Sequence, residues 1–290
     1  MMGLASLQAL PNETTAARRM ALSRLTGASR TADSHRVTAE LLVALLRRAI
    51  GTGALPDIPR ACDWERLVLV AAHHGVLPIL YRALRDRDAE VPDAVLQQLK
   101  LEYYANVLRN ELAQQLAGEI CRALGAERIP VILLKGIALI RTLYDDPGLR
   151  RLSDIDLLVD ARDVERASAQ LQRIAVEPVG TQETGRGPLC DLHRVYLRPD
   201  LRSLPVELHW RLYEGYQPYA FDLTEVWAQR RPLASAHDGA CTMSFEHELA
   251  HLCLHLDRHA VTYRSFAPPR FRQGMRLVPM ELNKIKRAAF

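Results

Sequence analysis

Cysteine is scarce in this sequence, and no two cysteines stand at CxxC spacing. Five are scattered over 290 residues, at Cys62, Cys121, Cys190, Cys241 and Cys253. An odd, scattered set excludes a disulfide-stapled secreted scaffold and fits a reducing compartment. With 48% hydrophobic and 25% charged residues, the chain has the composition of an ordinary globular protein that needs no such staple.

Long hydrophobic runs are also missing. No apolar stretch approaches the roughly 20 residues that span a bilayer. The N-terminal segment MMGLASLQALPNETTAARRM has no basic start followed by a long apolar run, so a secretory signal is not expected. The sequence therefore predicts a cytoplasmic protein with no membrane partner.

Charge of one sign is not in large excess. The net charge of +4 is too small to indicate nucleic-acid binding. Basic residues gather only after Ala260, against the single acid Glu281; they are Arg264, Arg270, Arg272, Arg276, Lys284, Lys286 and Arg287. Such a tail can attract phosphates, but solvated chain ends are often basic as well.

Hydrophobic spacing changes along the chain. Before residue 125 it is helical, with the longest helix expected from Pro92 to Leu124 and a break near Gly75 and Pro78. After Ile129, short apolar runs predict two buried strands with a helix between them, then a further helix and one or two strands. From Phe221 onward the spacing is helical again.

This order predicts the fold class. A βαβ-type unit followed by antiparallel strands indicates an α+β (α/β-like) core of ordinary domain size. We expect three parts: an N-terminal helical region over 1–125, a catalytic core over 126–235, and a C-terminal helix with a basic tail over 236–290.

Three carboxylates are the candidate catalytic residues. Asp154 and Asp156 alternate in an apolar stretch, so in a strand they point the same way. Burying two adjacent carboxylates is costly without a cation, and such hard oxygen ligands suit Mg²⁺. Glu207, flanked by apolar residues in PVELH, is a third candidate. On neighbouring strands, the three could hold two metal ions, one to activate an attacking oxygen and one to neutralise a triphosphate and its leaving group.

The candidate phosphate-binding residues surround this pair. Lys135 and Gly136 stand where the first strand passes into a helix, a place where backbone N–H groups and a glycine suit a phosphate. Arg150 and Arg151 lie just ahead of the acidic strand and could reach phosphate oxygens. Taken alone, the Asp-x-Asp motif is also typical of an exposed edge strand.

The segments LLKGIALIRTLYDDPGLRRLSDIDLLVD and VELHWRL resemble the uncharacterised bacterial nucleotidyltransferase family of the DNA polymerase β-like superfamily. The superfamily pattern has a glycine turn, a Dx[D/E] pair and a later third acid, which here match Gly136, Asp154 with Asp156, and Glu207. The resemblance implies a polymerase β-type core with a mixed sheet, Mg²⁺ dependence and an NTP substrate. The acceptor, whether small molecule, protein or RNA, is left open.

Two alternatives compete with this interpretation. His247-Glu248-Leu249-Ala250-His251 matches HExxH, the motif of zinc metallopeptidases. Leu254 stands where a glycine would let the chain turn toward a third ligand, so we expect no zinc there. The second alternative is a non-catalytic nucleotide-binding module that keeps the fold without turnover.

Two substitutions follow from the sequence. Asp156→Asn should lower activity by a factor on the order of a hundred or more and leave the melting temperature unchanged or raised, because it relieves repulsion between carboxylates. Gly136→Val should weaken NTP binding more than folding, because the glycine is expected to face phosphate.

Overall fold

The computed structural model describes residues 32–54, 56–86, 91–179, 192–212, 222–233 and 239–266. The α-helices in these ranges are α2 (Ala32–Ala49), α3 (Trp64–His73), α4 (Leu77–Leu84), α5 (Asp93–Ala126), α6 (Lys135–Thr142), α7 (Val164–Arg173), α8 (Leu223–Ala228) and α9 (Phe245–Phe266). Short 3-10 turns are η2 (Pro147–Leu149), η3 (Ala161–Asp163) and η4 (Pro199–Leu201).

Seven short strands of the described chain form one mixed sheet. They are β1 (Ile132–Leu134), β2 (Ile155–Leu158), β3 (Glu177–Pro178), β4 (His193–Leu197), β5 (Val206–His209), β6 (Arg231–Pro232) and β7 (Cys241–Thr242). Their order is β3-β4-β5-β2-β1-β7-β6. β2 runs parallel to β5, and β1 runs parallel to β7, whereas the other neighbours are antiparallel. The predicted α+β class with a mixed sheet is confirmed.

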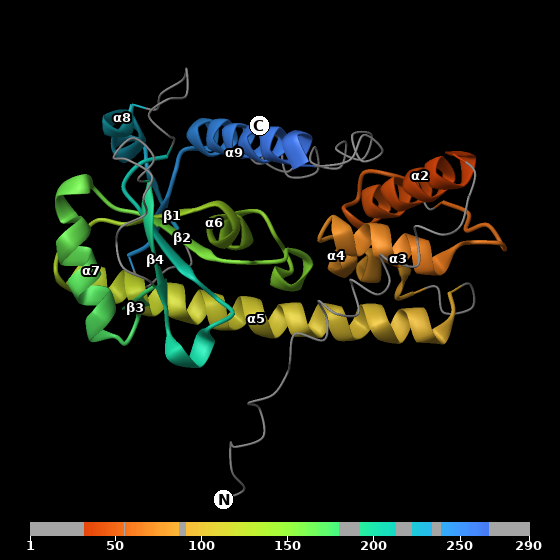
Figure 1. Ribbon diagram of the computed structural model, residues 1–290, viewed down its shortest axis with the longest axis horizontal. Coiled ribbons are helices and arrows are strands. Elements are labelled where there is room, and N and C mark those ends of the chain that lie inside the picture. The colour runs from red at the N-terminus through yellow and green to blue at the C-terminus, as the bar shows by residue number, and fades with distance from the viewer. Residues whose placement is uncertain are drawn as a thin grey trace, which may run out of the picture.

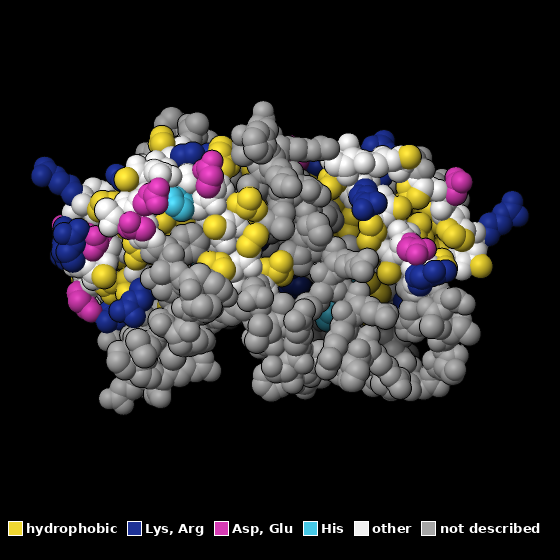
Figure 2. Space-filling view, turned by 90° about the horizontal axis from the view of Figure 1, so that it is seen from above, with side chains coloured by type: hydrophobic (Ala, Val, Ile, Leu, Met, Phe, Trp, Pro, Cys, Tyr) yellow, Lys and Arg dark blue, Asp and Glu magenta, His cyan; other side chains and the backbone are white. Residues whose placement is uncertain are grey.

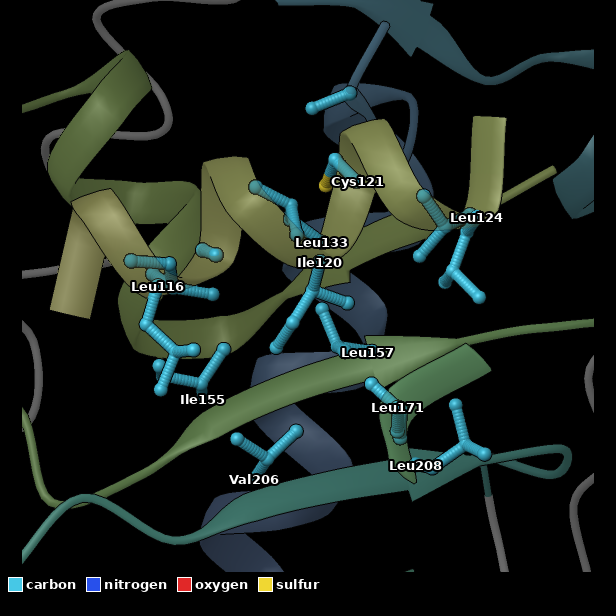
Figure 3. Packing of buried hydrophobic residues seen from close by; sticks show 14 of the residues in the cluster. Leu116, Ile120, Cys121, Leu124, Leu133, Ile155, Leu157, Leu171, Val206 and Leu208 are labelled. Carbon is cyan, nitrogen blue, oxygen red and sulfur yellow. The ribbon is translucent and has the colours of Figure 1, made fainter. Parts of the chain in front are cut away.

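The long helix α5 joins two hydrophobic cores. Its first half packs with α2, α3 and α4, and its second half packs against the sheet (Figure 1). In the second core, Leu116 of α5 points toward Ile155 of the sheet, and Ile120 points toward Leu157 (Figure 3). Because α5 serves both cores, the division of the chain at residue 125 remains a proposal.

Local residue types explain the N-terminal helices. The side chain of Asp63 accepts a hydrogen bond from the Arg66 backbone N–H and so caps α3. Gly75 adopts φ +66° just after α3, a conformation that glycine takes at little cost. The predicted helix break near Gly75 and Pro78 is thus confirmed, with Pro78 in the first turn of α4.

Alternation along β2 assigns its residues to opposite faces of the sheet. Ile155 and Leu157 belong to the core beneath α5, whereas Leu158 belongs to a smaller cluster that includes Val226 of α8. Because strand residues alternate, Asp156 shares the face of Leu158. The sheet therefore offers its acidic side chains away from α5.

The βαβ-type interpretation is wrong in one respect: β1 and β2 pair antiparallel, with Leu134 opposite Asp156. A βαβ unit requires the helix to cross back over the sheet. Here α6 leads away from the end of β1, and the following turn is bound to α5 by Asn106 and Asn110. The chain therefore re-enters the sheet at the end where it left.

The expectation of helices alone after Phe221 is also wrong. Residues 231–232 and 241–242 form β6 and β7, and β7 extends the sheet beside β1. Strands of two residues carry too little hydrophobic alternation to be predicted from sequence. Residues 180–191, which include Cys190, and the part of the basic tail beyond residue 266 lie outside the described residues.

Among the described residues, no helix combines the length and the apolar character needed to cross a membrane.

Candidate active site

The three predicted carboxylates meet on one face of the sheet. Asp156 of β2 stands directly opposite Glu207 in the parallel ladder with β5. Asp154 lies one residue before β2 and has the same parity as Asp156. One carboxylate oxygen from each residue lies within 4.8 Å of the others. The sequence therefore predicted correctly that these side chains come together.

Two nitrogen groups lie against Asp156, the most deeply buried of the three. Lys135 Nζ is 2.6 Å from Asp156 Oδ1, and His209 Nε2 is 2.9 Å from the same oxygen. His209 Nε2 is also 3.2 Å from Glu207 Oε2. Lys135 adopts φ +48° at the start of α6, a strained conformation for a lysine that accompanies its approach to Asp156.

These contacts separate the acidities of the two aspartates. Burial would raise the pKa of Asp156, but the hydrogen bond from His209 and the Lys135 ammonium outweigh it and hold that pKa below its usual value. Burial, followed by repulsion from Asp156 and Glu207, raises the pKa of Asp154 to about 6. Asp154 is thus the carboxylate whose negative charge is least compensated by the protein.

The donor set fits a hard divalent cation. Oδ1 of Asp156 is bound to Lys135 and His209, whereas its Oδ2 is buried without a hydrogen-bond partner among the described residues. Buried carboxylate oxygens are seldom left without a partner, because their desolvation is not repaid. A cation among the three carboxylates would satisfy this oxygen and offset the charge on Asp154.

The two predicted phosphate-binding arginines, Arg150 and Arg151, lie in different surroundings. Arg150 is close enough to Asp154 and Asp156 that their charges act on it, although burial lowers the pKa of its guanidinium. Arg151 is exposed and lines a shallow pocket with residues of α4 and α5, including Pro78 and Arg109. Arg150 is therefore within electrostatic reach of the two aspartates, and Arg151 lies beside α4 and α5.

Gly136 has a packing reason to be glycine. A Cβ at this position would lie 2.5 Å from Cδ2 of Leu152, a side chain in the core beneath the sheet. The structure therefore revises the expectation that Gly136→Val acts mainly on NTP binding, since folding should suffer as well.

We expect Gly136→Ala to lower the free energy of unfolding by about 1 to 3 kcal/mol, through overpacking against Leu152. Leu152→Ala removes the obstructing methyl groups, so Gly136→Ala should cost much less in that background. Urea unfolding of the two single variants and the double variant measures this coupling. Additive costs would show that Leu152 is not the reason for the glycine.

The HExxH motif lies on the first turns of α9, which is on the side of α6 opposite to α5 (Figure 1). His247 Nδ1 lies 3.0 Å from Ser244 Oγ at the start of the helix. Glu248 is buried, with Arg231 Nη2 at 3.8 Å. Its carboxylate thus lies beside a guanidinium, which is not the environment of a base that activates zinc-bound water.

Glu248 provides a pH-dependent test of this arrangement. Burial raises the pKa of Glu248 to about 7, so the folded state binds a proton more tightly than the unfolded state does. The contribution of this proton to the free energy of unfolding is complete below 4.5, the pKa of Glu248 in the unfolded chain. It is lost as the pH rises through about 7, the pKa in the folded state. Glu248→Gln should therefore stabilise the fold above pH 7, by at most about 3 kcal/mol.

Thermal unfolding of wild type and Glu248→Gln between pH 4.5 and 8 measures the difference. The two proteins should agree at the acidic end and diverge at the alkaline end. Equal stability at pH 8 would mean that Arg231 already compensates the charge.

Sequence reasoning missed three residues at this site. His209 contacts both Asp156 and Glu207, and the available signal was its position two residues after Glu207, on the same strand face. Asn106 donates to the Gly148 and Arg150 carbonyls, and Asn110 donates to the Pro147 and Arg150 carbonyls. These asparagines hold the segment that leads into the acidic strand.

A mixed sheet with helices on both faces carries the motifs quoted above (Figure 1). Residues 60–270 match the sequence model of the family described as uncharacterised nucleotidyltransferase. The chain belongs to this family, and the predicted resemblance is confirmed.

No curated protein matches the chain. Among solved structures, the solution structure of the antibiotic-resistance factor ANT(2'')-Ia is 13% identical, with a TM-score of 0.39, covering 62% of this chain and 90% of that one. The crystal structure of ANT(2'')-Ia with adenylyl-2''-tobramycin is 15% identical, with a TM-score of 0.38 and coverages of 60% and 93%. An antigenic nucleotidyltransferase-like protein from Paracoccidioides brasiliensis is 20% identical, with a TM-score of 0.36 and coverages of 61% and 74%.

Proposed function

We propose that this protein is a Mg²⁺-dependent nucleotidyltransferase that transfers a nucleoside monophosphate from an NTP to an acceptor. The observation that carries the proposal is the meeting of Asp154, Asp156 and Glu207 on one sheet face, with one oxygen of each within 4.8 Å of the others. Membership of the nucleotidyltransferase family supports the reaction class.

The three carboxylates would hold two Mg²⁺ ions. When bound, such ions neutralise the triphosphate and lower the pKa of the attacking hydroxyl. The unpartnered Oδ2 of Asp156 and the raised pKa of Asp154, about 6, both support a cation at this place.

The basic residues would bind the triphosphate. Lys135 Nζ, now 2.6 Å from Asp156 Oδ1, is near enough to the carboxylates to exchange that partner for a phosphate oxygen. Arg150 lies within the electrostatic reach of the same aspartates, and Gly136 begins α6 beside Lys135. Arg151, beside the pocket of α4 and α5, is better placed for the acceptor or the far end of the nucleotide.

The acceptor stays open between a small molecule, a protein and RNA. Seen from above, the basic and acidic side chains of the described residues are interspersed over the surface (Figure 2). Among the described side chains visible in this view, Lys and Arg do not gather into one large basic field of the kind that binds nucleic acid. The four cysteines in the described part of the chain form no disulfide with one another, which supports a cytoplasmic location.

Transfer of label from each NTP tests the proposal. The protein is incubated with Mg²⁺, a cell extract and an NTP labelled either at the α-phosphate or at the γ-phosphate. Nucleotidyl transfer labels an acceptor only from the α-labelled nucleotide. The Asp154→Asn variant should transfer no label to the acceptor. Transfer from the γ-labelled nucleotide would indicate a kinase, whereas tight Mg²⁺–NTP binding without any transfer would indicate the binding module.

A further inference from the structure

Beside the three carboxylates, β4 brings a nitrogen ligand to the same face of the sheet. His193 stands opposite His209 in the antiparallel ladder of β4 and β5. The two imidazole rings lie 4.7 Å apart between centroids. Opposite residues of neighbouring strands point to the same face, so His193 also faces Glu207.

Both histidines approach the same carboxylate oxygen of Glu207. His193 Nε2 lies 3.8 Å from Glu207 Oε2, and His209 Nε2 lies 3.2 Å from the same atom. One ligand atom from each residue lies within 4.8 Å of the other two. Glu207 thus belongs both to the carboxylate group and to a second group that contains two histidines.

The two groups differ in their donor atoms. Two imidazole nitrogens and a carboxylate oxygen are a ligand set typical of Zn²⁺ and Co²⁺, whereas Mg²⁺ prefers oxygen alone. Three protein ligands of this kind leave one coordination position for water or substrate. Ligation through His209 Nε2 would replace its present hydrogen bonds to Asp156 Oδ1 and Glu207 Oε2.

The hydrogen bonding of His193 supports a ligand role. Its Nδ1 is buried and has no hydrogen-bond partner in the part of the chain that the structure describes. A histidine that serves only packing or strand structure usually satisfies both ring nitrogens when they are buried. The carboxylate site alone explains neither the unpartnered Nδ1 of His193 nor the approach of its Nε2 to Glu207.

We infer that His193, Glu207 and His209 form a transition-metal subsite that shares Glu207 with the Mg²⁺ site. The inference goes beyond the proposed function and stands on the donor set alone, so it does not require that the chain transfers nucleotides. If both hold, the shared glutamate places a nitrogen-ligated ion next to the oxygen-ligated one.

Co²⁺ is the probe that tests this subsite, because nitrogen-ligated Co²⁺ of low coordination number absorbs strongly in the visible range. Titration of the metal-free full-length protein should produce these bands at one Co²⁺ per chain. His193→Gln should weaken this binding by a factor on the order of a hundred. His247→Gln, in the rival HExxH motif, is the matched control and should leave the bands unchanged.

A second variant keeps the test valid if His193→Gln does not fold. His193→Cys supplies a thiolate, so a new sulfur-to-cobalt charge-transfer band should appear only if position 193 is a ligand. The inference is overturned if wild type shows no bands, if His193→Gln binds Co²⁺ as well as wild type does, if His247→Gln loses the bands, or if His193→Cys gains no charge-transfer band. A protein that binds Co²⁺ through His193 but transfers no nucleotide would refute the proposed function and leave this inference intact.

Discussion

Asp156→Asn should lower nucleotidyl transfer by a factor on the order of a hundred or more and should also destabilise the fold. The loss of activity follows from removing a metal-binding charge. The loss of stability follows from Lys135 and His209, whose side-chain nitrogens both lie within 3 Å of Asp156 Oδ1 and would lose this buried anionic partner. Breaking one side of a buried ion pair costs about 3 to 5 kcal/mol.

Asp154→Asn should be equally inactive but at least as stable as wild type. The pKa of Asp154 is raised to about 6 from 3.8, so the folded state disfavours its ionised form. The protonated form of Asp154 stabilises the fold at a pH below 3.8, the pKa in the unfolded chain. This stabilisation is lost as the pH rises through about 6, the pKa in the folded state. At pH 7 the asparagine removes that cost, a gain of at most about 3 kcal/mol that should vanish near pH 4.

Chemical denaturation and label transfer measured on the two variants together test this contrast. Opposite changes in stability with a shared loss of activity are expected. If Asp156→Asn is as stable as Asp154→Asn, the ion pairs with Lys135 and His209 do not stabilise the fold. If either variant keeps transfer activity, that carboxylate is not an essential metal ligand.

Asn110→Leu should lower the free energy of unfolding by about 2 to 4 kcal/mol. Its side-chain amide donates to the carbonyls of Pro147 and Arg150, and Asn110 is fully buried. Leucine fills a similar volume but leaves two carbonyls without this donor. Because these carbonyls belong to the turn that leads to Asp154, nucleotidyl transfer should also fall in protein that remains folded.

Urea unfolding and label transfer at a temperature well below the melting point measure both effects. Gln115→Leu is the matched control, since Gln115 is exposed on the same helix and its substitution should change stability by no more than about 0.5 kcal/mol. Equal behaviour of Asn110→Leu and this control would show that the turn does not depend on α5.

The features that the sequence predicted correctly are those that depend on the alternation of polar and apolar residues within a single strand. Alternating polar and apolar residues were enough to place Asp154 and Asp156 on one face and to select Glu207 as the third acid. The register that sets Asp156 opposite Glu207 is parallel, and it could not be read from either strand alone.

The missed residues depend on distant partners. Asn106 and Asn110 read as polar positions of an ordinary helix, yet their acceptors lie about 40 residues further along the chain. The expected effect of Asp156→Asn on stability changed for the same reason. Repulsion from Asp154 is visible in the sequence, whereas the compensating contacts of Lys135 and His209 exist only once three strands and α6 are assembled.

Counting bound Mn²⁺ tests most directly whether the three carboxylates form one cation site. Mn²⁺ is a paramagnetic substitute for Mg²⁺, and its free concentration can be followed by electron paramagnetic resonance in the presence of a non-hydrolysable NTP. A His193→Gln background excludes binding at the histidine subsite. In that background we predict saturable Mn²⁺ binding beyond what the nucleotide alone accounts for, with the excess lost on Asp154→Asn. Equal Mn²⁺ binding with and without Asp154→Asn would contradict the account.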